Sequence, residues 1–427
     1  MMKATIEGIT TVARWDLQQR VRSRKLLVGW VVWAAVLTIT AGLIVSVAGQ
    51  NSDISTVAWR AQSGPTIFGL TVLIMLGFSM VVVPIFSASA IVSERESSTL
   101  AMLQATTLEA GQIVGGKLLS ACAVSAIFLA GGIPATGIAV AVGHISVLRA
   151  LVCLLVMYAQ MVLLCAIALG WSAIATRALV STVLTYITIF ALTVVTLIGF
   201  ALLGLTTVTY ETQHTYGLTY EQSEAYGQRL DQYFRDHPTP DGSKPPSPPL
   251  DQCTLQPSGN SFPVTHPERY WWLLLINPFV IVSDAAPLPA EAKGNLQAYQ
   301  RTVDFDPLAA IAAGVRSMRV ANTGTTDDCF GPDGTFVGYS YWVYPNPDGT
   351  YAISNTTVAT IGPPDERNTA VVAPVDNPFA RPAISMTTPL WPYGLGVHLL
   401  IAALFLWLAV RRVRVPYGRL PSGQRVA

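Results

Sequence analysis

Charged residues are scarce in this sequence: Asp, Glu, Lys and Arg make up 12% of its 427 residues. Soluble domains of ordinary composition carry about 25% charged residues. Hydrophobic residues make up 51% of the chain, so the composition excludes a disordered protein and a typical soluble enzyme. The scarcity of charge therefore indicates a membrane protein.

Patterns typical of catalysis and of metal binding are also lacking. The five histidines do not have the spacing of metal ligands: His144, His214, His237, His266 and His398. Gly111–Lys117 resembles the start of a phosphate-binding loop, but Leu118 stands where Ser or Thr is required. Gly338–Trp342 lacks the final glycine of a nucleophile elbow. We therefore expect no cofactor, metal or catalysis in this chain alone. The small residues Gly111 and Gly115 of the rejected phosphate-binding loop instead predict a close approach of two helices.

Long runs without charge are the most prominent feature that the sequence does have. Six runs without Asp, Glu, Lys or Arg contain 27 or more residues: Leu26–Ser52, Ala61–Ser93, Leu118–Leu148, Ala150–Thr176, Ala178–Tyr210 and Pro382–Val410. A bilayer core about 30 Å thick needs about 20 mostly apolar residues in a helix. The runs predict an all-α polytopic membrane protein with six transmembrane helices, five within residues 26–206 and the sixth at residues 391–411.

The distribution of charge predicts the orientation of these spans. Residues 207–390 hold 19 of the 25 acidic residues and 10 of the 26 basic residues, so their net charge is −9 and that of the remainder is +10. Basic residues cluster in residues 1–25 and 412–427 and at Arg411. Because basic flanks favour the cytoplasmic side, we predict a plasma-membrane protein with both termini in the cytoplasm. The N-terminal basic segment is too long for a signal peptide, so we expect it to be retained.

The acidic segment 207–390 is then an extracytoplasmic domain inserted between spans five and six, and we predict a mixed α/β fold. Its first part, Tyr210–Arg235, favours a helix. Phe336–Tyr344 and Thr350–Ile353 are aromatic and β-branched runs on either side of a Pro/Asp/Gly turn, which predicts a β-hairpin. Cys253 and Cys329 are the two cysteines outside the spans, and in an oxidising compartment they predict a disulfide.

One apolar segment of this region, Trp271–Val282, is too short to span and is interrupted by Pro278. Its tryptophan pair suits a membrane boundary. We predict a surface or re-entrant helix, and a buried helix of the outer domain is the alternative.

Two segments beside the spans have an amphipathic pattern. An apolar stripe recurs at steps of three and four in the N-terminal segment: Ile6, Ile9, Ala13, Leu17 and Val21. Arg14 and Arg22 occupy another face with Trp15 beside it, which is typical of an interfacial helix. A plain anchor to anionic lipid is the alternative.

The second amphipathic segment joins spans two and three. Ser93 and Glu96 form a capping-box pattern. Leu100 and Leu103 are three residues apart, so they would share one face of a short helix at about residues 94–108. This pattern predicts a cytoplasmic helix, and a simple connector lying on the bilayer is the alternative.

Ile91–Leu119 resembles the Glu-Arg-Glu…Thr-Leu…Leu…Gly-Lys signature of ABC-exporter permeases, the six-span membrane subunits of the type V, drug- and polysaccharide-exporter class. The charged positions match at Glu94, Arg95, Glu96 and Lys117, whereas Ser98 and Thr107 replace the usual glycine and proline. The N-terminal segment is similar to the interfacial connecting helix of that family, and Asn277–Phe279 resembles a stretch near its outer gate. The resemblance covers the membrane part and leaves the outer domain unexplained.

The resemblance implies a dimer of permease subunits, identical or related, each engaging a separate ABC ATPase that holds ATP and Mg. It implies that six residues transmit force from that ATPase: Glu94, Arg95, Glu96, Leu100, Leu103 and Lys117. Spans two and five line the pathway in this family, so the pathway candidates are Phe78, Ser79, Thr185, Tyr186, Thr188, Thr193 and Thr196. Helix packing is the alternative for the threonines. His398 is an ionisable group inside a predicted span and joins the pathway candidates, with a neutral packing role as the alternative.

The predicted spans contain no Asp, Glu, Lys or Arg. This absence disfavours ion-coupled transport and favours an apolar or amphipathic cargo over a small ion. The resemblance to exporters implies that the cargo moves outward. We expect the lipid bilayer, and no nucleic acid, among the partners. Two other classes stay open. A membrane-anchored outer domain that binds envelope components needs fewer than six spans, and a polytopic enzyme acting on lipid-linked substrates needs convergent acidic or His groups.

Overall fold

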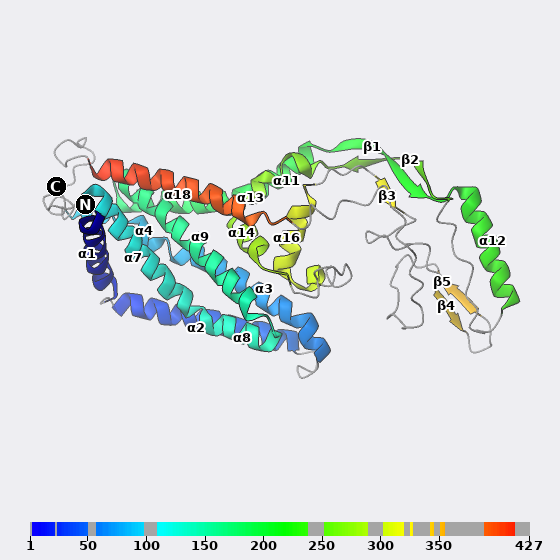
Figure 1. Cartoon of the computed structure of the whole chain (residues 1–427), viewed down its shortest axis with the longest axis horizontal. Coiled ribbons are helices and arrows are strands. Elements are labelled where there is room, and N and C mark those ends of the chain that lie inside the picture. The colour runs from blue at the N-terminus through cyan, green and yellow to red at the C-terminus, as the bar shows by residue number, and fades with distance from the viewer. Residues whose placement is uncertain are drawn as a thin grey trace. The chain divides into compact units, whose positions relative to one another are not determined.

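Figure 1 shows the computed structural model of the chain, which describes residues 2–21, 24–49, 57–97, 109–237, 252–288, 302–319, 325–327, 342–345, 351–354 and 388–414. The chain forms two compact units. The first, here the membrane unit, contains residues 1–202, 269–319 and 386–427. The second contains residues 203–268 and 320–385, and it is called the outer unit after its predicted location. The segment 207–390 is therefore divided, because residues 269–319 pack with the spans.

Six helical segments of the described chain are long and apolar enough to cross a membrane: Leu27–Val47, Ser63–Glu96, Ala110–Gly131, Val147–Ile174, Ala178–Thr206 and Trp391–Val413. They confirm the prediction of an all-α polytopic membrane protein. The helices are α2 (Arg24–Gly49), α3 (Val57–Val82), α4 (Ile85–Ala88), α5 (Val92–Glu96), α7 (Ala110–Gly131), α9 (Val147–Ile174), α10 (Ala178–Phe190), the π-helical turn η1 (Ala191–Val195), α11 (Thr196–Thr206) and α18 (Trp391–Val413). Helix α1 (Met2–Val21) precedes them, and α8 (Ile133–Gly143) follows α7.

The prediction that the spans hold no charged residue is wrong. Helix α7 starts at Ala110 and includes Lys117, and α9 starts at Val147 and includes Arg149. Span two ends with the charged triplet at Glu94. These side chains sit near helix ends and have ionic or carbonyl partners, which lowers the cost of placing them there.

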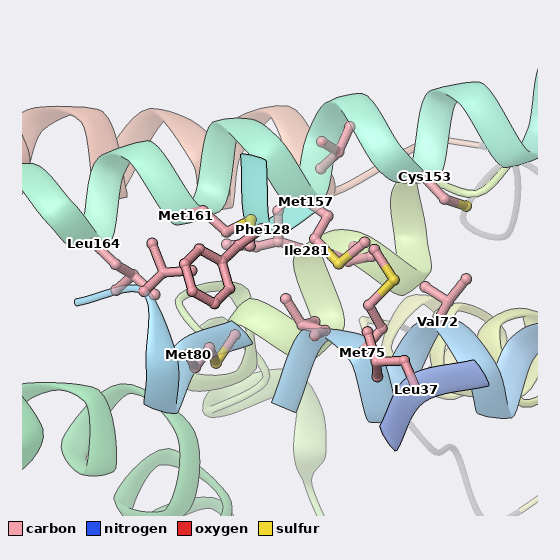
Figure 2. Close-up of a cluster of buried hydrophobic side chains, with 14 of the residues drawn as sticks. Leu37, Val72, Met75, Met80, Phe128, Cys153, Met157, Met161, Leu164 and Ile281 are labelled. Carbon is pink, nitrogen blue, oxygen red and sulfur yellow. The ribbon is translucent and has the colours of Figure 1, made fainter. Parts of the chain in front are cut away.

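The core of the membrane unit is packed by side chains from α2, α3, α7, α9 and α14 (Figure 2). Its labelled members are Leu37, Val72, Met75, Met80, Phe128, Cys153, Met157, Met161, Leu164 and Ile281. Four of the ten are methionines, whose flexible side chains fill irregular gaps. Around this core α18 packs along α9, and α1 packs along α7 (Figure 1).

The close approach of α1 to α7 depends on small residues. A Cβ atom on Gly116 would lie 2.5 Å from the Cβ of Val12, and one on Gly115 would lie 3.4 Å from Ile9. A Cβ on Gly111 meets nothing within 4 Å. The prediction of a glycine-mediated contact is therefore correct for Gly115, wrong for Gly111, and incomplete because it omitted Gly116.

The described part of the membrane unit between spans five and six includes the short helices α13 (Trp272–Leu275), α14 (Pro278–Ala285) and α16 (Pro307–Ser317). Helix α14 packs against α9, α16 and α18, and α16 packs against α3. The apolar segment Trp271–Val282 is thus a helix pair of the membrane unit. The alternative of a buried helix in the outer domain is wrong, because its contacts are with the spans.

The outer unit contains a three-stranded sheet in the order β2-β1-β3. Strand β1 (Thr209–Gly217) is antiparallel to β2 (Thr254–Val264) and parallel to β3 (Thr325–Asp327). The predicted helix over Tyr210–Arg235 is correct only in its second half, α12 (Tyr220–Asp236). The first half is a strand because its Thr and Tyr side chains suit a sheet and its backbone pairs with β2.

The predicted hairpin is confirmed over its described part, where β4 (Trp342–Pro345) pairs antiparallel with β5 (Tyr351–Ser354). A 3₁₀ turn, η3 (Pro267–Arg269), follows β2. Cys253 is buried. Cys329 lies outside the described residues, so the disulfide between them stays a prediction.

Candidate functional site

The charged triplet Glu94-Arg95-Glu96 forms the end of α5, where span two ends. The predicted capping box at Ser93 is wrong: the helix begins at Val92, and no side chain caps it. The backbone N–H groups of Ile91 and Val92 instead donate to the Ser172 hydroxyl of α9, at 2.9 and 3.1 Å. A hydroxyl from another span therefore supplies the acceptor that a local cap would have supplied.

Glu94 forms a buried ion pair with Lys117 of α7. The Lys117 Nζ lies 2.6 Å from Glu94 Oε1 and 3.7 Å from Asp16 Oδ1 of α1, and its side chain is 2% exposed. One ammonium group is therefore placed between two carboxylates from two different helices. The arrangement connects the end of span two, the beginning of span three and the N-terminal helix.

Asp16 completes this network. Its Oδ2 accepts from Arg20 Nε at 2.7 Å and from the Ser120 hydroxyl at 2.5 Å. Arg20 Nη1 also donates to the Phe86 carbonyl of α4, at 2.7 Å. Burial raises the pKa of Asp16, but attraction to Arg20 and Lys117 outweighs it and holds the pKa below its ordinary value of 3.8. Asp16 is therefore ionised at neutral pH and fixes α1 to both α4 and α7.

Arg95 and Glu96 contact the ends of the next two spans. The Arg95 guanidinium, itself 2% exposed, donates from Nη1 and Nη2 to the carbonyls of Ala175 and Ala173, both at 3.3 Å. These carbonyls close α9, where the helix dipole is negative. Glu96 Oε1 accepts from the N–H of Ala178 at 2.9 Å, at the start of α10, where the dipole is positive. The triplet therefore contacts three spans. Glu94 binds the Lys117 side chain of span three, Arg95 binds carbonyls at the C-terminus of span four, and Glu96 binds an N–H at the N-terminus of span five.

The remaining coupling candidates are placed only in part. Leu100, Leu103 and Arg22 lie outside the described residues. Arg14 and Trp15 are exposed on α1, whereas Val12 and Ile9 pack against α7. The predicted amphipathic stripe is thus in contact with protein at Ile9 and Leu17, whereas Arg14 of the basic face is exposed.

A second polar constellation joins spans five and six to the turn between α13 and α14. Asn277 Nδ2 donates to the carbonyl of Thr193 at 2.9 Å and to the hydroxyl of Thr196 at 3.0 Å. Thr193 belongs to the π-helical turn η1, a geometry that is frequent at functional sites. The Asn277 side chain therefore binds span five at its irregular turn.

His398 of α18 contacts the same turn from the other side. Its Nε2 lies 2.8 Å from the Ile276 carbonyl, and its Nδ1 lies 2.6 Å from Gln160 Nε2 of α9. These contacts fit a neutral imidazole that donates from Nε2 and accepts at Nδ1. Sequence reasoning missed Gln160, whose only signal was an uncharged polar residue within a long apolar run.

The hydroxyl pathway candidates mostly bond to their own helices. Each of these side chains donates to the carbonyl four residues earlier: Ser79, Thr185, Thr188, Thr193 and Thr196. Such back-bonding suits helix packing. Tyr186 donates to the Val81 carbonyl at 2.5 Å, beside the break at Pro84 in span two. Phe78 is the exposed member of the set, and the assignment of the whole set to a pathway stays a prediction.

Two further buried ion pairs hold α16 at the other end of the spans. Arg149, in the first turn of α9, pairs with Asp306, the N-cap residue of α16. In the last turn of α16, Arg316 Nε lies 2.6 Å from Asp284 Oδ1 of α14. Asp284 Oδ2 accepts from the N–H groups of Leu390 and Trp391 at the start of α18. Among the described residues, no three His, Cys, Asp or Glu side chains form a candidate metal site.

The family described as ABC-2 family transporter protein matches residues 10–259, more than half of the chain. The match includes most of α1, the charged triplet with Lys117 and spans one to five. A comparison with curated proteins found no match. The chain belongs to the ABC-2 family of transporter proteins, in which it is a membrane-embedded permease component of an ABC transporter.

Proposed function

We propose that this chain is the membrane subunit of an ATP-driven exporter that works with a separate ATPase. The observation that carries the proposal is the set of contacts made by Glu94, Arg95 and Glu96 at the end of span two. Through them, any movement of the segment at residues 97–108 acts directly on spans three, four and five. Such a linkage suits a subunit that receives force at one cytoplasmic segment.

In this proposal the permease works as a dimer, with an identical or related subunit, and ATP and Mg stay on the ATPase. Both termini lie in the cytoplasm, and the outer unit, with its proposed disulfide between Cys253 and Cys329, lies outside. The cargo is apolar or amphipathic and moves outward. Charged side chains at Lys117 and Arg149 do not oppose this, because each is buried and paired with a carboxylate.

The proposal is tested by purifying the full chain from its native membrane in mild detergent and identifying any ATP-binding polypeptide that copurifies. ATP hydrolysis of that complex is then compared for the natural sequence, Glu94→Gln and Arg95→Gln. We expect both variants to lower hydrolysis at least several-fold, because each breaks a link between the end of span two and another span. Arg24→Gln is the matched control, since Arg24 is exposed.

The proposal would be overturned if no ATP-binding polypeptide copurifies although the natural sequence and all variants accumulate in the membrane to the same level. Turnover of a lipid-linked substrate by the purified chain alone would favour a membrane enzyme instead. Retention of envelope components by the outer unit, without any ATPase, would favour a membrane-anchored binding protein.

A further inference from the structure

Arg149 is a buried cation whose hydrogen-bonding capacity is mostly unused. Its side chain is 4% exposed and contacts Asp306 through Nη2 alone. Its Nε and Nη1 are buried and have no hydrogen-bond partner in the part of the chain that the structure describes. The guanidinium carbon lies 5.8 Å from the centre of the Phe68 ring, so an aromatic face closes one side.

Asp306 is a limited partner because its other oxygen is already committed. Asp306 Oδ1 accepts from the N–H of Leu308 at 3.0 Å and so caps α16. A buried donor without an acceptor costs about 1–3 kcal/mol. An arginine fork is suited to two parallel bonds with a carboxylate or a phosphate. Arg149 therefore has the geometry of an anion site that its present partner fills incompletely.

The two ends of α16 are attached differently. At its C-terminal end, Arg316 donates to both the side chain and the carbonyl of Asp284, at 2.6 and 3.2 Å. At its N-terminal end, the ion pair with Arg149 is supplemented by a hydrogen bond from the Thr66 hydroxyl of α3 to the Phe305 carbonyl. Pro307 also contacts Gly69, where a Cβ would lie 2.8 Å from the proline. The N-terminal end, where donors remain without partners, is the end that gains from release.

We propose that Arg149 binds the anionic head group of an amphipathic molecule, through phosphate or carboxylate oxygens, when the N-terminal end of α16 moves away with Asp306. The head group takes the place of the Asp306 carboxylate and also supplies acceptors to Nε and Nη1. This inference rests on the proposed function and names the class of cargo.

The surroundings of Arg149 suit an amphipathic ligand. Val147, Leu148 and Leu151 lie in the same stretch of α9 and are 68%, 67% and 49% exposed. These three side chains lie on other faces of α9, because residues one and two positions from Arg149 are turned about 100° and 160° from it. They give this end of the span an exposed apolar surface on which the chains of a ligand can lie. A free anion gains nothing from that surface.

The test measures lipid retained by the purified full chain, without ATP or an ATPase. The protein is exchanged into mixed micelles that contain phosphatidylglycerol or phosphatidylcholine, and bound lipid is counted by native mass spectrometry. Asp306→Asn keeps a good N-cap while removing the carboxylate, and it leaves Arg149 free to bind. We expect it to retain several-fold more phosphatidylglycerol than the natural sequence, with no gain for phosphatidylcholine.

Asp284→Asn is the matched control, because it breaks the other ion pair of α16 and leaves Asp306 in place. Asp284→Asn should show no increase in retained phosphatidylglycerol, and the increase seen in Asp306→Asn should disappear in the double variant Arg149→Gln/Asp306→Asn. Equal retention by all variants would overturn the inference, as would a gain that survives the loss of Arg149. Displacement of the lipid by inorganic phosphate at millimolar concentration would also overturn it, since it would indicate a free-anion site.

A second measurement serves if Asp306→Asn does not fold. Phosphatidylglycerol should raise the unfolding temperature of the natural sequence more than that of Arg149→Lys, which keeps the charge and lacks the fork. Equal shifts would overturn the inference. Because neither measurement involves ATP, failure here leaves the proposed partnership with an ATPase to be judged separately.

Discussion

The two ends of the membrane unit both contain buried ion pairs, but they use them differently. At the end that carries α1, Lys117 lies between Glu94 and Asp16, and Asp16 is also bonded to Arg20 and Ser120. At the end that carries α16, Arg149 contacts one carboxylate oxygen, and two of its donors have no hydrogen-bond partner among the described residues. Along α9, at 1.5 Å per residue, Arg149 lies about 36 Å from Ala173, whose carbonyl Arg95 contacts. Shared partners make the first end rigid, whereas the attachment of Arg149 to a single carboxylate oxygen makes the start of α16 the more easily released part of the second end.

The largest expected effect tests the rigid end. Lys117→Met leaves the Glu94 and Asp16 carboxylates without their shared ammonium group. Breaking a buried pair on one side costs about 3–5 kcal/mol, and we expect that loss in the free energy of unfolding measured in detergent. The double variant Glu94→Gln/Lys117→Met should recover part of it, because one unpaired charge is then absent. A loss below about 1 kcal/mol would show that the network contributes little rigidity.

A smaller effect is expected where α1 touches α7. Gly116→Ala places a Cβ 2.5 Å from Val12 and 2.9 Å from the Ile9 carbonyl, and this overpacking should cost about 1–3 kcal/mol. Gly111→Ala is the matched control, since nothing lies within 4 Å of its Cβ. It should raise stability by about 0.5–1 kcal/mol. Equal unfolding temperatures for the two variants would contradict the close approach of these helices.

Acid should weaken the same end in a predictable direction. The pKa of Asp16 in the folded chain lies below its ordinary value of 3.8, so its ionised form contributes stability at neutral pH. That contribution is lost as the pH falls through the folded pKa. Asp16→Asn should flatten the decline in unfolding temperature as the pH falls below the ordinary pKa of 3.8. An unchanged slope would show that Asp16 is not held ionised by Arg20 and Lys117.

The smallest effect is expected from the outer unit. The Arg319 Nη1 lies 2.8 Å from the Thr388 hydroxyl, so the chain returns close to the place where it leaves α16. Replacing residues 321–386 with a short Gly/Ser linker should leave the unfolding temperature of the membrane unit almost unchanged. Unfolding of the spans after this replacement would show that they depend on the outer unit.

The number of spans could be predicted from the sequence, but not all of their ends. Runs without charge end the predicted spans at Lys117 and Arg149, whereas α7 and α9 contain both residues. Both are tolerated because a carboxylate from another helix lies beside each. Hydrophobic runs report composition along the chain, whereas this compensation depends on contacts across it.

The candidate site shows the same limit. The resemblance of Ile91–Leu119 to the family signature identifies Glu94, Arg95, Glu96 and Lys117 as candidates, and their coupling role stays a prediction. Most of their partners lie far away in the sequence and have no local signal: Ala173 is 78 residues from Arg95, and Ala178 is 82 residues from Glu96. Contacts of backbone carbonyls with Arg95 have no residue-type signal at all, since any residue can provide them.

The π-helical turn in span five has a consequence for the direction of side chains. Each residue of an α-helix turns about 100° around the axis, and a π turn accommodates one extra residue without ending the helix. Side chains of α11 are therefore out of phase with those of α10 by about that angle. Deleting one residue from Ala191–Val195 would bring the two halves back into phase and turn every later side chain of the span. The deletion of one residue would therefore rotate the side chains of α11 around the helix axis, while the sequences of α10 and α11 stay the same.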